Sequence, residues 1–325
     1  MKRILVTGGA GYIGSNTVLQ LVDQGYDVVV VDSLVRGFRD AVDPKLLRVA
    51  DVHDAAALER IFAEKPVDAV IHFAAYISVG ESMHLPELYF ENNTGGSLSL
   101  FTAMVKAGVK HAVFSSTAAV YGMPAQSPIP ETLPYAPINP YGESKVMTEK
   151  ILGWFDRIHG LRSVALRYFN ASGADPKGRA GERHDPETHL IPLLFRAIET
   201  GAPVTIFGED YPTPDGTCIR DYVHVTDLAQ AHILAVESLL SGAPSNRFNV
   251  GTGSGFSIRQ VIDSVERVTG KKVPFTVGPR REGDPPELVA DSAKLKTTLG
   301  WKPQFPELDQ IVQTAWRWAE SRPRS

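Results

Sequence analysis

Cysteine is almost missing from this sequence: Cys218 is the one cysteine in 325 residues. A single thiol cannot form a disulfide within the chain, which favours a reducing compartment. Long apolar runs are missing as well, since none approaches the roughly 20 residues that a membrane-spanning helix needs. The first predicted strand begins at residue 2. We therefore expect neither a signal peptide nor a membrane anchor, and a cytoplasmic location.

An excess of charge of either sign is also lacking. The 33 lysine and arginine residues face 37 aspartate and glutamate residues, for a formal net charge of −4. This balance gives no indication of nucleic acid or of a membrane surface as a partner. The sequence contains no repeats, no low-complexity tract and no residues that we assign as metal ligands. With 43% hydrophobic residues, we expect a globular protein with one large domain and a smaller one.

A glycine-rich turn follows the first apolar run. The segment GGAGYIG (8–14) joins a predicted strand to a predicted helix. Its glycines permit a tight turn, let backbone approach a pyrophosphate and let the helix pack on the sheet, while the helix N-terminus faces the phosphates. A second apolar run, 28–31, ends at Asp32, whose carboxylate would bind the adenine ribose and repel a 2′-phosphate. We therefore predict NAD rather than NADP, and interpret Arg36 as a solvated loop residue.

Apolar runs alternate with amphipathic segments through the first half. Predicted strands cover 4–6, 28–31, 69–73, 112–114 and 163–169, and predicted helices cover 15–24, 54–64, 86–106 and 141–159. This alternation predicts an α/β fold, a doubly wound parallel-sheet Rossmann domain with a smaller α/β substrate-binding domain. We place the cofactor domain at 1–170 and the substrate domain at 171–325, and expect a segment near 220–250 to return to the first.

Three side chains suggest acid–base chemistry. Tyr141 and Lys145 lie four residues apart at the start of a predicted helix, so they share one face. A nearby ammonium and a positively charged nicotinamide ring would each favour the phenolate, which would let Tyr141 act as a general base. Ser115, Ser116 and Thr117 place hydroxyls at the C-terminal end of a strand, where open α/β sheets bind ligands.

These motifs occur in the order found in short-chain dehydrogenases/reductases. The sequence resembles one family of the extended group, the UDP-glucose 4-epimerases (UDP-galactose 4-epimerases), over nearly its whole length. The resemblance rests on GGAGYIGS (8–15), HFAA (72–75), VGES (79–82), SSTAAVYG (115–122), NPYGESK (139–145), LRYFN (166–170), FGEDYPT (207–213), IRDYVHV (219–225) and RREGD (280–284). The later motifs belong to the family's nucleotide-sugar pocket.

The resemblance implies an NAD-dependent isomerase of carbohydrate (galactose) metabolism. It implies transient oxidation at C4 of the UDP-sugar, rotation of the 4-keto sugar and re-reduction on its other face. Tyr141 would take the proton of the 4-hydroxyl, Thr117 would orient that hydroxyl, and Lys145 would hold the nicotinamide ribose. The resemblance also implies a homodimer that packs through the helices near 86–106 and 141–159.

The remaining site residues follow from the same resemblance. For the cofactor they are Gly8, Gly11, Tyr12, Ile13, Gly14, Asp32, Asp51, Val52, Phe73, Ala74, Ala75, Asn92, Ser115, Tyr141, Lys145 and Tyr168. For the UDP-sugar they are Thr117, Tyr141, Asn170, His189, Leu190, Phe207, Arg220, Arg281 and Asp284. Guanidinium groups suit the diphosphate because they bind it in a bidentate fashion.

Three positions depart from the family pattern. Ile77 replaces a lysine that some members place near the cofactor phosphates, and His189 stands where asparagine is frequent. Leu288 occupies the approximate place of a bulky tyrosine in glucose-restricted members. The smaller side chain would leave room for a 2-acetamido group, so we also expect activity on UDP-N-acetylglucosamine and UDP-N-acetylgalactosamine.

Other functions remain open from the sequence. A nucleotide-sugar 4,6-dehydratase, a UDP-glucuronate decarboxylase or a pentose 4-epimerase would also act at C4. The dehydratase normally has an acidic pair after the strand-end threonine, and Ala118 and Ala119 stand there instead. A non-enzymatic NAD-sensing protein would not need Thr117, Tyr141 and Lys145 together.

Overall fold

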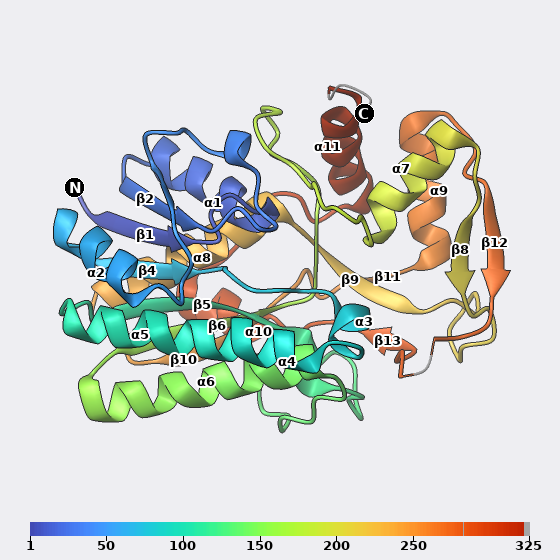
Figure 1. Cartoon of the computed structure of the whole chain (residues 1–325). Helices are drawn as coiled ribbons and strands as arrows, with labels where there is room; N and C mark the ends of the chain where they lie inside the picture. The colour runs from blue at the N-terminus through green and yellow to red at the C-terminus, as the bar shows by residue number, and fades with distance from the viewer. Residues whose placement is uncertain (282, 322–325) are drawn as a thin grey trace.

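A seven-stranded parallel sheet forms the larger part of the computed structural model, which describes residues 1–281 and 283–321 (Figure 1). Its spatial order is β3-β2-β1-β4-β5-β6-β10. The strands are β1 (Arg3–Thr7), β2 (Asp27–Asp32), β3 (Leu47–Val49), β4 (Ala69–His72), β5 (His111–Thr117), β6 (Arg162–Tyr168) and β10 (Asn246–Val250). The order reverses between β1 and β4, and ligands bind beside such a reversal. The predicted doubly wound α/β fold is confirmed.

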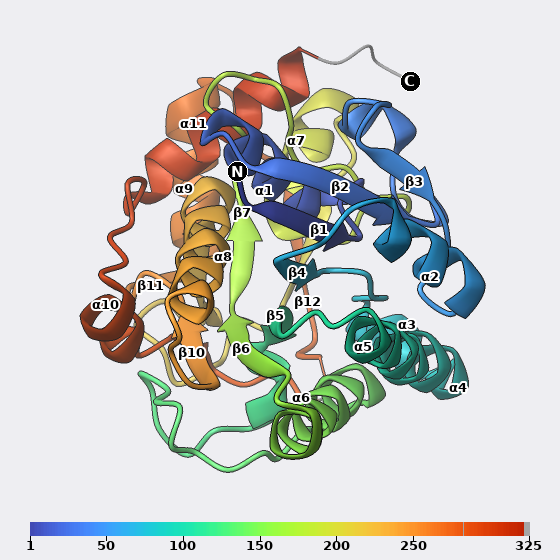
Figure 2. The ribbon, with the colours of Figure 1, turned by 90° about the vertical axis from the view of Figure 1, so that its left-hand side faces the viewer.

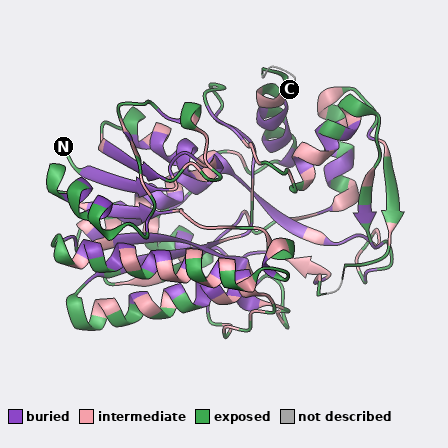
Figure 3. Cartoon of the chain, viewed as in Figure 1, coloured by how far each residue is buried: buried purple, intermediate pink, exposed green. Residues whose placement is uncertain are grey.

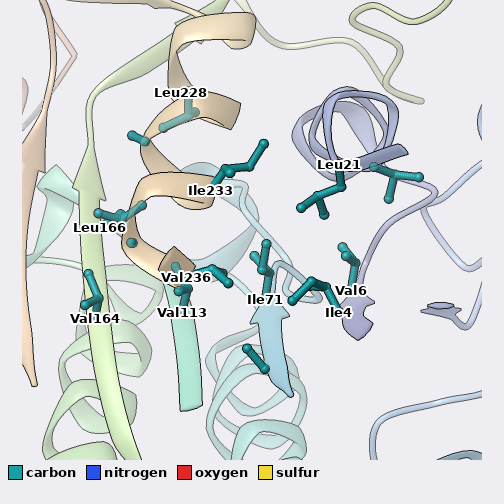
Figure 4. Close-up of a cluster of buried hydrophobic side chains, with 14 of the residues drawn as sticks. Ile4, Val6, Leu21, Ile71, Val113, Val164, Leu166, Leu228, Ile233 and Val236 are labelled. Carbon is teal, nitrogen blue, oxygen red and sulfur yellow. The ribbon is translucent and has the colours of Figure 1, made fainter. Parts of the chain in front are cut away.

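Helices cover both faces of this sheet (Figure 2). One face carries α1 (Tyr12–Asp23) and α8 (Val225–Leu240), and the other carries α2 (Ala55–Glu64), α5 (Gly96–Lys106) and α6 (Pro140–His159). Figure 4 shows the first layer, where side chains of α1 and α8, including Leu21 and Ile233, meet those of the strands. Leu166 is fully buried there. Truncating such a side chain to alanine costs about 2–5 kcal/mol, so this layer fixes the sheet that carries the site.

The helix that carries Tyr141 has a well-defined start. The Asn139 side chain accepts a hydrogen bond from the backbone N–H of Gly142 at 2.8 Å, and Pro140 occupies the first turn. An N-cap residue and proline at this position both favour initiation. The helix therefore begins one residue before the predicted start at residue 141. Because its first turn is capped, the position of Tyr141 is fixed.

The predicted helix at 86–106 is interrupted by a π-helical segment. The chain forms α4 (Pro86–Tyr89), then η2 (Phe90–Gly95) with π-helical hydrogen bonding, then α5. Asn93 in η2 is buried, and its side-chain amide donates to the Tyr76 carbonyl and the Ser144 hydroxyl. Single-turn π-bulges of this kind occur frequently at functional sites. The segment ties the loop after β4 to α6.

The second half of the chain forms a smaller α/β unit. Its strands are β7 (Asn170–Ser172), β8 (Val204–Phe207), β9 (Ile219–His224), β11 (Gly255–Ser257), β12 (Phe275–Gly278) and β13 (Glu287–Leu288), and its helices are α7 (Leu190–Thr200), α9 (Ile258–Thr269) and α11 (Leu308–Glu320). Strand β9 pairs with β7, β11 and β13, while β8 pairs with β12.

The first half of the chain also contains three short helical turns, which are η1 (Arg39–Ala41), α3 (Val79–Ser82) and η3 (Ala118–Tyr121).

Three segments of the later sequence lie against the large sheet, namely β10, α8 and α10 (Ala293–Leu299), whose Leu295 is buried in the same cluster as side chains of α1 and α8. β10 pairs in parallel with β6, and α8 packs on the face shared with α1. The strands of the large sheet are mostly buried, whereas the outer faces of α5 and α6 and the strands β8 and β12 carry exposed residues (Figure 3). In the described part of the chain, no helix combines the length and apolar character needed to cross a membrane.

Candidate active site

A cavity of about 420 Å³ lies between the carboxyl ends of the central strands and the smaller unit. Eighteen of the sequence-predicted site residues line it, from both halves of the chain. They are Gly8, Gly11, Tyr12, Ile13, Gly14, Asp32, Asp51, Val52, Phe73, Ala74, Ala75, Asn92, Thr117, Tyr141, Tyr168, Asn170, His189 and Leu190. Its place beside the β1–β4 reversal is where a doubly wound sheet binds ligands.

The glycine turn forms one wall of the cavity. A Cβ atom on Gly8 would lie 2.5 Å from the Ala74 nitrogen, and one on Gly14 would lie 2.2 Å from the Gly8 carbonyl oxygen. Gly8 also has a φ of 67°. Helix α1 starts here without a side-chain cap or an acidic residue in its first turn. Its free N–H groups and positive dipole end therefore suit an anion such as a pyrophosphate.

Asp32 closes β2 at the edge of the same wall. Its buried carboxylate accepts hydrogen bonds from the backbone N–H groups of Ala10 (2.9 Å) and Leu34 (2.8 Å). Burial raises the pKa of Asp32, and these two hydrogen bonds oppose that rise. A carboxylate has further acceptor sites for ribose hydroxyls. Arg36 lies in the loop after β2 with its side chain 46% exposed, as predicted, and its guanidinium pairs with the Glu81 carboxylate at 2.9 Å.

The three predicted catalytic residues lie together at the end of β5. Tyr141 is buried, packs against the Tyr89 ring at 6.4 Å between centroids and shares a hydrogen bond with Thr117. Lys145 is buried behind the cavity wall, where its ammonium donates to the Ser115 carbonyl at 3.0 Å. The Lys145 nitrogen is 5.9 Å from the centre of the Tyr141 ring. The helical spacing therefore places both side chains at one site.

Burial shifts the pKa values of both Tyr141 and Lys145 in the chain alone. Burial raises the pKa of the Tyr141 phenol, and the hydrogen bond with Thr117 lowers it. Burial also lowers the pKa of Lys145 to about 7, although the Glu149 carboxylate raises it. Burial therefore opposes both charged forms in the chain alone, and the predicted lowering of the Tyr141 pKa by Lys145 and a positive nicotinamide ring stays a prediction. A further positive charge in the cavity is needed to favour the phenolate.

A buried ion pair supports the catalytic helix, and sequence reasoning missed it. The Arg167 guanidinium donates to both oxygens of the Glu149 carboxylate, at 3.0 and 2.6 Å, and both side chains are almost fully buried. Glu149 also accepts from the Ser116 hydroxyl at 2.6 Å. The pair links α6, β5 and β6. The sequence feature that could have indicated the pair is Glu149 itself, which lies four residues after Lys145 and therefore on the same helical face.

Six predicted site residues lie outside the cavity wall. Ser115 and Lys145 are behind it, and the Ser115 hydroxyl donates to the hydroxyl of Tyr168 at 2.8 Å. The other four, Phe207, Arg220, Arg281 and Asp284, form a separate group in the smaller unit. There the Arg220 guanidinium donates to Asp284, and the Arg281 guanidinium lies 4.6 Å from the centre of the Phe207 ring. Glu282, within the RREGD motif, lies outside the described residues.

The loop 173–189 forms the opposite wall, and the sequence analysis had assigned only His189 from it. Glu182, His184 and Asp185 of this loop also line the cavity. The hydroxyl of Tyr12 donates to the Gly173 carbonyl at 2.6 Å, which ties the glycine turn to the loop. Burial lowers the pKa of His189, but the carboxylates of Glu182 and Glu187 raise it to about 9. The sequence feature that could have indicated this wall is the dense run of charged residues in 182–189.

Two of the departures from the family pattern have clear positions. Ile77 lines the cavity and is 44% exposed. Leu288 is half-buried and packs against the cluster that contains Ala118 and Tyr121, directly after Thr117. Position 288 is therefore close to the end of β5, although it does not belong to the cavity wall among the residues described.

Comparison with known proteins places the chain among relatives of one kind. A model of the NAD dependent epimerase/dehydratase family matches residues 4–251. The sequence is 52% identical to UDP-glucose 4-epimerase of Lacticaseibacillus casei over 322 residues, 98% of this chain and 97% of that one. UDP-glucose 4-epimerase from Brucella ovis in complex with NAD is 46% identical, with a TM-score of 0.95 and 98% of both chains covered. The UDP-Glc/GlcNAc 4-epimerase of Campylobacter jejuni is 38% identical, with a TM-score of 0.87, 99% of this chain and 100% of that one covered.

Proposed function

Because the chain belongs to the NAD dependent epimerase/dehydratase family, among its UDP-glucose 4-epimerases, we propose that it interconverts UDP-glucose and UDP-galactose with NAD as cofactor. The observation that carries this proposal is the buried pair of hydroxyls, Tyr141 and Thr117, at the wall of the cavity that also contains the glycine turn. The alternative reactions at C4 are not favoured, since the relatives are UDP-glucose 4-epimerases, and a dehydratase would in addition lack its acidic pair because Ala118 and Ala119 follow Thr117.

The chain's own residues would handle the proton. The phenol oxygen of Tyr141 takes the proton of the sugar 4-hydroxyl and later returns it to the 4-keto sugar after the sugar has turned over. Thr117 would hold the 4-hydroxyl by a hydrogen bond, and Lys145 would hold the nicotinamide ribose beside the phenol. Bound NAD supplies the acceptor and donor of hydride at C4. No net oxidation results, because the hydride returns to the same carbon.

The wall of the cavity fits NAD by the chemistry of its donors and acceptors. The uncapped N-terminus of α1 would receive the pyrophosphate, and Asp32 would accept from the adenine ribose. Asp51 and Val52 would border the adenine, and Asn92 would lie near the pyrophosphate. The small side chains Ala74 and Ala75 leave room beside Gly8. Phe73, Ser115 and Tyr168 complete this set of proposed cofactor residues.

The UDP-sugar would extend from the cavity towards the second half of the chain. Asn170, His189 and Leu190 line the cavity on that side. We assign the diphosphate and uridine to the separate group of Phe207, Arg220, Arg281 and Asp284, where two guanidinium groups are available. This assigns residues 1–170 and the segment from α8 to β10 to the cofactor, and the rest of 171–325 to the sugar nucleotide.

We extend the proposal to N-acetylated sugars. Leu288 lies near the end of β5 and offers a smaller side chain than tyrosine. The Campylobacter jejuni relative, named for both UDP-Glc and UDP-GlcNAc, supports this extension.

We propose further that the chain forms a homodimer through α5 and α6. These helices lie side by side on one surface (Figure 1) and expose Leu98, Met147, Trp154 and Ile158. Trp154 and Ile158 are 61% and 69% exposed, which is unfavourable for adjacent large apolar groups in water. Light scattering after gel filtration tests this: twice the 35.4 kDa chain mass is expected, and a variant with Trp154→Glu and Ile158→Glu is expected to be a monomer.

The experiment that tests the epimerase function uses the purified protein without added cofactor. The protein is incubated with UDP-glucose, and formation of UDP-galactose is followed by chromatography. A parallel sample is denatured and the released nicotinamide dinucleotide is quantified. If the protein forms no UDP-galactose either with the cofactor it was purified with or after NAD is added, the proposal is wrong.

A further inference from the structure

Four potential metal ligands converge in the loop between β7 and α7. They are the side chains of Glu182, His184, Glu187 and His189, and one ligand atom from each lies within 4.8 Å of all the others. The four residues fall within eight positions of one loop, so the cluster forms without bringing distant segments together.

The spacing suits a tetrahedral ion. Zn²⁺ binds imidazole nitrogen and carboxylate oxygen at about 2.0–2.2 Å, which places neighbouring ligand atoms about 3.3–3.6 Å apart. The Nδ1 atom of His184 lies 3.5 Å from a carboxylate oxygen of Glu182 and 3.5 Å from one of Glu187. The Nδ1 atom of His189 donates to the carboxylate of Glu182. Small rotations of these side chains would therefore give a set of two nitrogens and two oxygens.

The charges of the cluster also favour a cation. The side chains of Glu182 and Glu187 are only 5% and 16% exposed, so two carboxylates share a largely buried site. His184 Nδ1 is shielded from solvent and has no hydrogen-bond partner among the described residues. This nitrogen lies 3.5 Å from a carboxylate oxygen of Glu182 and of Glu187, at the limit of hydrogen-bonding distance, and coordination to an ion would give it a closer partner. The adjacent Arg183 pairs with Asp40 rather than with the cluster.

The loop is held in place on both sides of Glu182. The indole N–H of Trp318 in α11 donates to the Glu182 carbonyl at 3.0 Å. The guanidinium of Arg183 lies 3.4 Å from the centre of the Phe38 ring. The Tyr12 ring packs edge-on against His184, with 6.0 Å between centroids. These contacts orient the ligand atoms in advance, which is what supporting contacts do in metal sites.

We propose that Glu182, His184, Glu187 and His189 bind one divalent transition-metal ion, best matched by Zn²⁺, at the rim of the cavity. Oxygen-only sites suit Mg²⁺ and Ca²⁺, whereas two imidazoles favour zinc. The ion would hold His189, which faces the sugar-nucleotide side, and would therefore slow turnover. This regulatory part rests on the proposed epimerase function, whereas the binding itself does not.

Binding is tested on tag-free protein with its bound cofactor, by competing Zn²⁺ against a chromogenic chelator. We expect one ion per chain and nitrogen and oxygen ligands by X-ray absorption. Glu187→Gln keeps an oxygen that can accept from the backbone N–H groups of residues 188 and 189, and is expected to raise the zinc dissociation constant at least tenfold. His184→Ala is also expected to raise the zinc dissociation constant at least tenfold.

His53→Gln is the matched control, since His53 pairs with the Asp51 carboxylate and lies outside the cluster. It should leave the zinc dissociation constant unchanged. The site is refuted if the chain binds no stoichiometric zinc, or if Glu187→Gln and His184→Ala bind as tightly as the original chain. Circular dichroism spectra of both variants report whether they remain folded.

Regulation is tested by measuring UDP-glucose turnover with free zinc set by a metal buffer, because the substrate diphosphate also binds zinc. We expect one equivalent of zinc to lower turnover at least fivefold, a chelator to restore it, and Glu187→Gln to be insensitive. Equal inhibition of Glu187→Gln would contradict regulation through this site. Inactivity before zinc is added would instead count against the epimerase function, so the two failures are distinguishable.

Discussion

Replacing Tyr141 with phenylalanine removes one hydroxyl and leaves the ring in its buried place against Tyr89. A positioned acid–base group contributes about 10²–10⁴-fold to a rate. At about 1.36 kcal/mol per tenfold, the barrier should rise by about 2.7–5.4 kcal/mol. The folded state loses one hydrogen bond, to Thr117, worth about 0.5–1.5 kcal/mol. Turnover should therefore fall by at least a hundredfold while the protein stays folded.

The assay compares kcat for UDP-glucose with the thermal midpoint of the same preparation. Tyr89→Phe is the matched control, because Tyr89 is also buried and its hydroxyl donates to Glu81 at 2.8 Å. Both variants lose one hydrogen bond and should shift the midpoint by only a few degrees. Only Tyr141→Phe should lose activity. If it retains more than a tenth of the original kcat, the proposed role of the phenol is wrong.

Four further changes have defined outcomes. Asp32→Asn removes the charge that would accept from the adenine ribose, and should raise the NAD dissociation constant at least tenfold in a fluorescence titration. Glu149→Gln leaves the Arg167 guanidinium buried without its counter-charge, and should lower the free energy of unfolding in urea by about 3–5 kcal/mol. Leu288→Tyr should lower turnover of UDP-N-acetylglucosamine at least tenfold and that of UDP-glucose less than threefold. Burial lowers the pKa of His232 to about 4, although the Leu228 carbonyl raises it. The unfolded chain therefore takes up this proton below about pH 6.5, whereas the folded chain does so only near pH 4. The free energy of unfolding consequently falls as the pH is lowered from about 6.5 to about 4. His232→Leu should reduce that fall between pH 6 and 4 by about 1.4 kcal/mol per pH unit, measured by urea unfolding at each pH.

The parts of the fold that the sequence predicts well are those set by local pattern. Apolar runs of three to seven residues indicated the strands of the large sheet, and Asn139 followed by Pro140 marks the start of α6. The interruption of 86–106 by η2 was not predicted, because its residues are compatible with an α-helix. The π-helical turn depends on Asn93 reaching Tyr76 and Ser144, which are contacts between separate segments.

The same distinction applies to the site. Gly8 and Asp32 could be identified because each role depends on a strand end and the turn beside it. The Glu149–Arg167 pair joins α6 to β6, so no window of sequence contains both partners. The loop 173–189 has no regular periodicity, and its convergence on the cavity depends on anchors such as Tyr12 and Trp318. The sequence therefore predicted site residues of which most line the cavity, but not the contacts that hold them in place.

The electrostatics connect the supporting groups to the chemistry. Burial opposes the charged forms of both Tyr141 and Lys145, and the Glu149 carboxylate is the group that opposes this effect at Lys145. Glu149 also forms the buried ion pair with Arg167, which fixes its carboxylate on the same face of α6 as Lys145. A positive nicotinamide ring in the cavity would favour the phenolate, and its reduction to a neutral ring would remove that effect. The proton affinity of Tyr141 would then follow the redox state of the cofactor, which makes the phenol a base when the sugar is oxidised and an acid when it is reduced.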